Sequence, residues 1–313
     1  MRHPQQETLP VPALDSPYRL GDEDVASFRR NGFVHLRGVA TPSELEALGP
    51  SIEATALAQN LQKQPLDQRD TYGRAFLQVI NLWLSDARVQ AFVFARRFAR
   101  IAAELLGVPG VRLYHDQALF KEPYGGHTPW HQDQYYWPLD TDDTVTLWMP
   151  LSRVPDEIGG MRFAAGSHRL GHLGDFAIGD QSHEVFSTLI QERGLAVESV
   201  GRLEAGDATF HHGWTLHSAG ANPTNSMRPV MTVIYFKDGA RLSPLDHPAR
   251  RADAAMYLPG CLPGEIAESE YCPRLYPRDP GPVPPAPVRS EEYWARVFKA
   301  LEGIRSERRD DRE

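Results

Sequence analysis

Five short segments in the middle of the chain, each rich in Val, Thr and aromatic residues, constrain the fold more than any other feature. They are separated by Gly, Pro and Asp and cover 111–120, 144–151, 159–164, 207–212 and 229–236. Runs of β-branched and aromatic residues bounded by turn formers are typical of the strands of β-sandwiches and barrels. The chain is therefore expected to be mainly β from residue 108 onward.

The residues before this region predict helices. Gly21-Asp22-Glu23-Asp24 opens a short helix with acids at the positive end of its dipole, and Asn31-Gly32 ends it. A strand is predicted over 33–39. Thr41-Pro42-Ser43-Glu44 then combines an N-cap, a proline at the first helical position and a capping box. A long helix is predicted over 86–106, with Gly107 as its stop.

Prolines mark both ends of the chain. Residues 1–20 carry four prolines without periodicity and predict a loose arm. Six prolines between 276 and 287 exclude a helix and a central strand, and a final helix is predicted over 290–304. The segment 169–200 is a polar insertion between two strands, and loops of that length are commonly functional or mobile.

Charge and composition exclude several classes of protein. The net charge is −8 and no run of Lys or Arg exceeds two residues, which argues against a nucleic-acid surface. No stretch of about 18 apolar residues predicts a membrane span. The N-terminus has no apolar segment typical of a signal peptide, and two cysteines are too few for a disulfide scaffold or a four-cysteine metal site. A cytoplasmic globular protein is expected.

The chemistry is concentrated at His131-Gln132-Asp133. In an extended chain, residues two apart point the same way, so His131 and Asp133 can present an imidazole and a carboxylate to one point. A structural hydrogen-bonded pair is the alternative. A second histidine would complete a set of two imidazoles and one carboxylate, which leaves open positions on a metal and suits non-haem Fe(II).

The segment 206–217 offers three histidines for this third position. His217 is favoured over His211 and His212, because Arg228 follows it 11 residues later across a turn-rich piece. Two strands joined by that turn would bring the guanidinium near the metal, where it could bind a carboxylate through two parallel hydrogen bonds.

These motifs resemble the phytanoyl-CoA dioxygenase family of Fe(II)/2-oxoglutarate oxygenases. The resemblance runs from about residue 23 to 236. The matching residues are 28–34, His131-Gln132-Asp133, Gly159-Gly160-Met161-Arg162-Phe163, Gly166-Ser167-His168-Arg169, Gly206-Asp207, and His217 through Asn222 and Ser226 to Arg228. The resemblance implies a double-stranded β-helix, which is a cupin-like jelly roll with flanking helices. The dioxygenase domain would span 21–245, with helical support over 21–107, a core over 108–245 and a C-terminal extension over 246–313.

The resemblance also implies roles for single residues. His131, Asp133 and His217 would hold iron, and Arg228, helped by Ser226, would pair with the distal carboxylate of 2-oxoglutarate. Gln117 and Trp148 match positions that contact this co-substrate, and Trp137 matches one that packs on substrate in some relatives. From the residues alone, Trp148 is as consistent with a core aromatic as with a cofactor contact.

The expected reaction is the oxidation of an unactivated C–H bond of a small molecule, most simply hydroxylation, with O2 consumed and succinate and CO2 released. Asp133 argues against halogenation, because related halogenases lack the carboxylate. A zinc hydrolase is one alternative, since the same ligands can bind zinc and activate water, but it leaves Arg228 without a role. The other alternative is an inactive jelly-roll binding module. The substrate could be a lipid or a natural-product intermediate.

Overall fold

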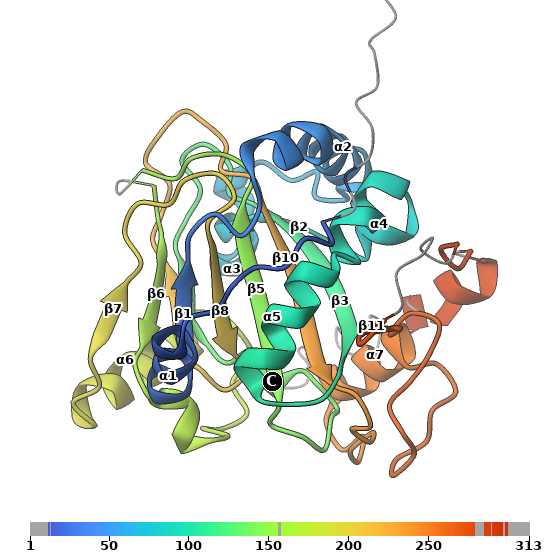
Figure 1. Ribbon diagram of the computed structural model, residues 1–313. Helices are drawn as coiled ribbons and strands as arrows, with labels where there is room; N and C mark the ends of the chain where they lie inside the picture. The colour runs from blue at the N-terminus through green and yellow to red at the C-terminus, as the bar shows by residue number, and fades with distance from the viewer. Residues whose placement is uncertain are drawn as a thin grey trace, which may run out of the picture.

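Two antiparallel sheets packed face to face form the centre of the molecule. The computed structural model describes residues 12, 14–155, 158–278, 285–288, 290–296 and 298–299. The larger sheet has the order β1-β8-β5-β10-β3-β11 with β2 also paired to β3, and the smaller has the order β4-β9-β6-β7 (Figure 1). The strands are β1 Phe33–Leu36, β2 Leu77–Ile80, β3 Val111–Phe120, β4 Thr128–His131, β5 Thr144–Pro150, β6 Met161–Ala164, β7 Val197–Ser199, β8 Ala208–His212, β9 His217–Ala219, β10 Val230–Lys237 and β11 Arg274–Tyr276. This curled pair of sheets confirms the predicted jelly roll.

The alternation of side chains along the central strands builds two different environments. In β5, Val145, Leu147 and Met149 point to the helices outside the large sheet and belong to its hydrophobic core. Thr146 and Trp148, on the opposite face, line a cavity between the two sheets. One face of the sheet therefore stabilises the fold while the other forms a site.

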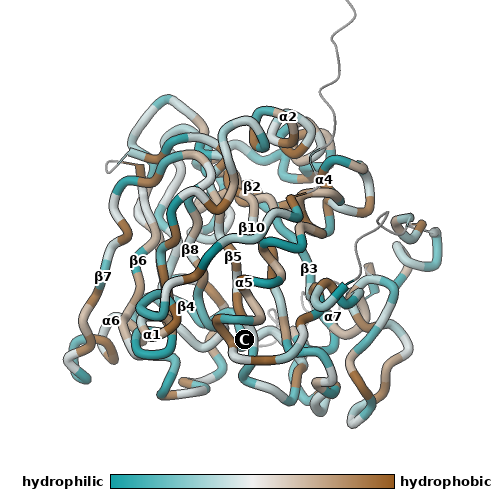
Figure 2. The backbone as a smooth tube through the Cα atoms, viewed as in Figure 1, coloured by the Kyte–Doolittle hydropathy of each residue, from teal (hydrophilic) through white to brown (hydrophobic). Residues whose placement is uncertain are grey.

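Helices from the first third of the chain cover the outer face of the large sheet (Figure 1). The α-helices are α1 Asp22–Asn31, α2 Pro42–Gln59, α3 Thr71–Ala75, α4 Ala87–Val93, α5 Arg96–Leu106, α6 Asp180–Glu192 and α7 Pro248–Tyr257. Helix α5 packs on β3, β5, β10 and β11. Figure 2 shows brown hydrophobic stretches alternating with teal ones along α4 and α5, as expected for helices with one buried face. The predicted capping box is present, because the Thr41 hydroxyl accepts from the Glu44 amide and the Glu44 carboxylate accepts from the Thr41 amide.

The prediction of one long helix over 86–106 is wrong, because this segment forms two helices, α4 and α5. The chain breaks at Phe94 and Ala95, between α4 and α5. The amide of Arg97, in the first turn of α5, donates to the Leu14 carbonyl. A partner from a distant segment therefore satisfies a donor that a continuous helix would have used internally.

The arm predicted over 1–20 is not loose in its described part. Leu14 is buried and Tyr18 donates a hydrogen bond to the Arg37 carbonyl. The guanidinium of Arg97 donates to the Ser16 carbonyl and forms a bidentate ion pair with Glu44. Residues 1–11 and 13 lie outside the described residues.

The insertion and the C-terminal extension are both more ordered than their compositions suggest. The segment 169–200 contains helix α6, which packs on β4, and strand β7. The extension contributes α7 and β11, and α7 packs on β3 and β10 through a core of its own that includes Tyr114, Phe236, Ala252 and Tyr257. Much of the proline-rich stretch (279–284) and the end of the predicted last helix (300–304) lie outside the described residues, whereas residues 291–296 are helical.

Among the described residues, no helix is both long and apolar enough to cross a bilayer. The cytoplasmic location stays a prediction.

Candidate active site

Two paired strands of the small sheet bring the predicted metal ligands together. His131 ends β4, His217 begins β9, and the two are direct partners in the antiparallel register. Residues in this relation project from the same face of a sheet, and the imidazole centroids lie 4.0 Å apart. Gln132 keeps an extended backbone, so Asp133 falls on the same side as His131. One ligand atom from each of the three residues lies within 4.8 Å of the others.

Hydrogen bonds fix the orientation of both imidazoles. Nδ1 of His131 lies 2.8 Å from the Pro129 carbonyl and Nδ1 of His217 lies 2.9 Å from the Thr215 carbonyl. Each carbonyl accepts a proton on Nδ1, which leaves Nε2 with its lone pair toward Asp133, 3.5 Å and 3.6 Å from Oδ1. Burial, reinforced by His131, lowers the pKa of His217 well below its usual value, so its ring is in the neutral form that binds metals.

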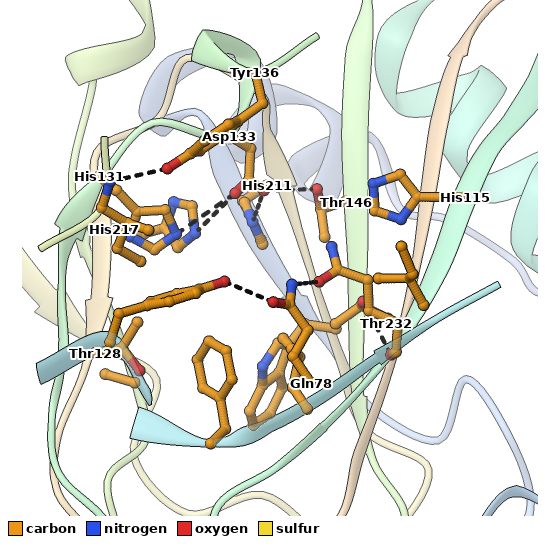
Figure 3. A pocket seen from close by; sticks show the side chains of 18 of the residues that line it. Gln78, His115, Thr128, His131, Asp133, Tyr136, Thr146, His211, His217 and Thr232 are labelled. Carbon is orange, nitrogen blue, oxygen red and sulfur yellow. Dashed lines mark hydrogen bonds and ion pairs between the residues drawn. The ribbon is translucent and has the colours of Figure 1, made fainter. Parts of the chain in front are cut away.

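The second carboxylate oxygen of Asp133 is held separately. The Thr146 hydroxyl donates to Oδ2 over 2.9 Å, and Nε2 of His211 lies 3.3 Å from the same oxygen (Figure 3). Burial opposes ionisation of Asp133, but His217, His131 and His211 together hold its pKa well below the usual range. Oδ1 therefore faces the two ligand histidines while Oδ2 is anchored to the large sheet.

Arg228 lies in the same cavity as these ligands and carries its charge there. Its side chain is buried over the ring of Trp148, and Nη1 donates to the Gly159 carbonyl. Its Nε is buried and has no hydrogen-bond partner within the described structure. Burial lowers the pKa of Arg228 to about 10, so it remains a cation at neutral pH.

Lys121 is the direct strand partner of Arg228 and is fully buried. Its Nζ donates a hydrogen bond to the Gly126 carbonyl over 2.5 Å. Burial, with a smaller effect of Arg228, lowers the Lys121 pKa to about 6. At neutral pH this side chain is thus mostly uncharged, and Arg228 supplies the positive charge of this corner.

A row of side chains crosses three strands of the large sheet beside Arg228. Thr232 on β10 is the register partner of both Gln117 on β3 and Trp148 on β5. All three line the cavity, as does Gln78 on β2, which donates a hydrogen bond to the Gln117 side chain (Figure 3). Trp148 also packs in the core between the two sheets, so it is both a core aromatic and part of the cavity lining.

The cavity has a volume of about 320 Å³, enough for a co-substrate and part of a small molecule. Figure 3 shows the ligand histidines on one side and Gln78, Thr232 and His115 across from them. The wall beyond His115 comes from α7 of the C-terminal extension, through Asp253, Met256 and Tyr257. Ile178 from the insertion and Tyr72 and Phe76 from the segment around α3 complete it.

The structure brings most of the predicted site residues into this cavity, with one exception. His131, Asp133, His217, Arg228, Gln117, Trp148 and Trp137 all line it. Ser226 does not, because its side chain is exposed and its hydroxyl contacts Asn225 over 3.4 Å. Its carbonyl instead accepts from buried Asn222, which holds the turn before Arg228.

Sequence reasoning missed several lining residues. His211 was set aside as a ligand, yet it contacts the Asp133 carboxylate. His211 lies in β8 two residues after Thr209, so both side chains point to the same, inner face of the sheet. This alternation is the signal that could have placed His211 at the site. No local pattern marks Asp253 or Tyr257, because they reach the cavity from a helix 36 and 40 residues after His217.

With the geometry established, comparisons with known proteins define the family. The model of the family "Phytanoyl-CoA dioxygenase (PhyH)" matches residues 28–230, well over half of the chain. The chain belongs to the phytanoyl-CoA dioxygenase family. The match covers all three candidate ligands and Arg228, and it ends before α7.

Several relatives of this chain are alpha-ketoglutarate-dependent enzymes, and the structure of one of them contains Fe3+. A probable alpha-ketoglutarate-dependent hypophosphite dioxygenase of Stutzerimonas stutzeri is 28% identical over 153 residues, which are 47% of this chain and 52% of that protein. The chain thus aligns with about half the length of this curated relative. Among solved structures, the non-heme alpha ketoglutarate dependent carbocyclase SnoK from nogalamycin biosynthesis has a TM-score of 0.67 and 26% identity, with coverage of 83% of this chain and 99% of that one. The epimerase SnoN in complex with Fe3+, alpha ketoglutarate and nogalamycin RO has a TM-score of 0.65 and 27% identity, with coverage of 81% and 98%.

The residues present fit both groups that these relatives use. Two imidazoles and one carboxylate form the donor set of a non-haem iron centre with open positions. A buried guanidinium whose Nε has no partner suits the carboxylate of 2-oxoglutarate.

Proposed function

We propose that this chain is an Fe(II)- and 2-oxoglutarate-dependent dioxygenase that hydroxylates an unactivated C–H bond of a small molecule, with release of succinate and CO2. The observation that supports it is the convergence of His131, Asp133, His217 and Arg228 on one cavity. A lipid or a natural-product intermediate is the proposed class of substrate. Bound iron would supply the redox chemistry that activates O2.

The side chains would divide the work along the cavity. His131, Asp133 and His217 would bind iron from the small sheet, with Thr146 and His211 orienting the Asp133 carboxylate. Arg228 would bind the distal carboxylate of 2-oxoglutarate, beside Trp148 and the amide of Gln117. The aromatic wall made by Trp137 and its neighbours would hold the substrate and exclude water.

The experiment is a screen of metabolite extracts with the Fe(II)-loaded protein, 2-oxoglutarate and air, with succinate release as the readout. The Asp133→Ala protein is the control. Hydroxylation predicts succinate formation only with wild type and a product that gains one oxygen atom from 18O2.

Other outcomes would contradict the proposal in recognisable ways. Turnover that continues without oxygen would indicate the metal-dependent hydrolase, for which Arg228 has no role. Failure to form succinate with every fraction, despite bound iron and 2-oxoglutarate, would indicate an inactive binding module. Succinate release with a product that carries no new oxygen would keep the oxygenase chemistry but contradict hydroxylation.

A further inference from the structure

The C-terminal extension places a half-buried acid in the wall of the cavity. Asp253 lies on α7, and its carboxylate accepts a hydrogen bond of 2.7 Å from the hydroxyl of Tyr114, which is fully buried on β3. In the described part of the chain, this hydroxyl is its sole hydrogen-bond partner, and no Lys or Arg forms an ion pair with it. The carboxylate lies deep in the molecule and remains partly accessible because it opens to the cavity.

The groups around Asp253 do not compensate its charge. Burial raises the pKa of Asp253 to about 7, with Tyr114 acting in the opposite direction. His115, a basic side chain in the same wall, is neutral, because burial lowers its pKa to about 4. Tyr257 stacks on His115 with ring centroids 4.6 Å apart and is itself far from ionising. A buried carboxylate with one neutral donor is costly, and a cationic ligand would remove that cost.

Aromatic rings complete the surroundings of this carboxylate. Tyr114, which donates to Asp253, lies 5.5 Å from Trp137 and 5.0 Å from Tyr257 between ring centroids. Trp137 and Tyr257 both line the cavity, as does Tyr136. A carboxylate and aromatic rings that line the same cavity can together bind an ammonium group, because the acid and the negative faces of the rings both attract a cation.

The charges at the other end of the cavity strengthen this argument. If the proposed function holds, Fe(II), doubly charged 2-oxoglutarate, ionised Asp133 and Arg228 cancel one another. Among the described residues that line the cavity, Asp253 is then the acid without a counterpart, and a cation beside it would favour its ionised form. A substrate with one positive charge would neutralise the loaded cavity, whereas a second anion would face an opposing carboxylate.

We propose that Asp253 and the aromatic side chains of Trp137 and Tyr257 bind a positively charged nitrogen of the substrate, so that the enzyme acts on an amine. This inference rests on the proposed function and names its substrate class. Asp253 is a specificity-determining residue that is 120 residues from Asp133 in the chain and outside the segment matched by the family. The ammonium end would be fixed at α7 while a C–H bond further along the molecule faces the iron ligands.

The test compares two probes of nearly equal shape, cyclohexylmethylamine and cyclohexylmethanol. Each is titrated by anaerobic calorimetry into the Fe(II) protein with 2-oxoglutarate. We expect wild type to bind the amine at least tenfold more tightly than the alcohol. Asp253→Asn should remove this preference, because the amide keeps the shape and can still accept from Tyr114. Asp246→Asn is the matched control, since it removes an exposed acid just before α7, and it should keep the preference.

The assignment would be overturned if the wild-type protein bound both probes equally or bound neither of them. It would also be overturned if the preference for the amine persisted in Asp253→Asn. Asp253→Ser provides a second variant if the asparagine protein does not fold. Failure of the proposed function would look different. It would appear as a lack of 2-oxoglutarate binding by wild type, seen as a missing metal-to-ligand charge-transfer band, while the amine preference can still be measured on the same protein.

Discussion

The guanidinium carbon of Arg228 lies 5.1 Å from the centre of the Trp148 ring, so the cation is held against an aromatic face at the bottom of the cavity. The Gly159 carbonyl accepts a hydrogen bond from Nη1 of Arg228. The Trp148 ring and the Gly159 carbonyl together fix the plane of the guanidinium without a ligand. A guanidinium that is already oriented loses little conformational freedom when it binds a carboxylate.

Arg228→Ala is expected to weaken 2-oxoglutarate binding about thirtyfold or more. Loss of one partner of a buried, charge-assisted pair typically costs about 2–5 kcal/mol, and each ~1.4 kcal/mol is a factor of ten. Arg228→Lys keeps the charge without the fork and should lie between wild type and Ala. The measurement is an anaerobic titration of the Fe(II) protein followed by the charge-transfer band, with exposed Arg153→Ala as control. Unchanged affinity in Arg228→Ala would make this arginine structural.

Asp133→Ala should abolish iron binding and turnover, because it leaves two imidazoles and removes the only carboxylate of the ligand group. Metal analysis after gel filtration measures the iron that remains. Asp143→Ala, which removes a more exposed acid paired with Lys237, should retain wild-type iron content. One iron per chain in the Asp133→Ala protein would contradict the ligand assignment.

Thr146→Val should lower iron affinity by about tenfold to a hundredfold, the usual effect of losing a group that orients a ligand. The substitution keeps the shape and removes the hydrogen bond to Asp133 Oδ2. Thr209→Val is a matched control, because Thr209 is also buried on this sheet and its hydroxyl has no partner in the described structure. Competition with a chromophoric Fe(II) chelator gives both affinities, and equal effects of the two substitutions would argue against an orienting role.

Lys121 should make stability depend on pH. Its pKa is about 6 in the folded protein and near 10.5 when unfolded, so the unfolded chain binds more protons between these values. The free energy of unfolding should therefore increase as pH rises from 6 toward 10. Urea denaturation at several pH values should show this contribution in wild type and in the exposed control Lys237→Met, and not in Lys121→Met. The same pH dependence in all three proteins would contradict the assignment.

Strands β1, β3, β5, β6, β8 and β10 could be predicted because their information is local, whereas β2, β4, β7, β9 and β11 were not predicted. The segment 111–120 is bounded by turn formers, and β3 occupies the same residues. The break between α4 and α5 could not, since apolar residues recur at helical spacing on both sides of Ala95. What decides the break is the carbonyl of Leu14, a group 83 residues away from Arg97 in the chain.

The same distinction applies to the site. His131, Asp133 and His217 come together as predicted, because one motif and one spacing select them once the chain is β. Ser226 shows the limit of a match by position. The Asn222 side chain donates to the Ser226 carbonyl, and the Ser226 side chain is exposed. The position of Asp253 in the cavity wall could not be predicted, because no sequence pattern near it indicates that α7 packs against β3.

Helix α7 follows β10, the last long strand, in the chain, yet it forms the wall of the cavity beyond His115, across from the candidate ligands His131 and His217. Under the proposed role of Asp253, a recombination after residue 245 would replace the part of the cavity wall that selects the substrate and would keep the candidate iron ligands and Arg228.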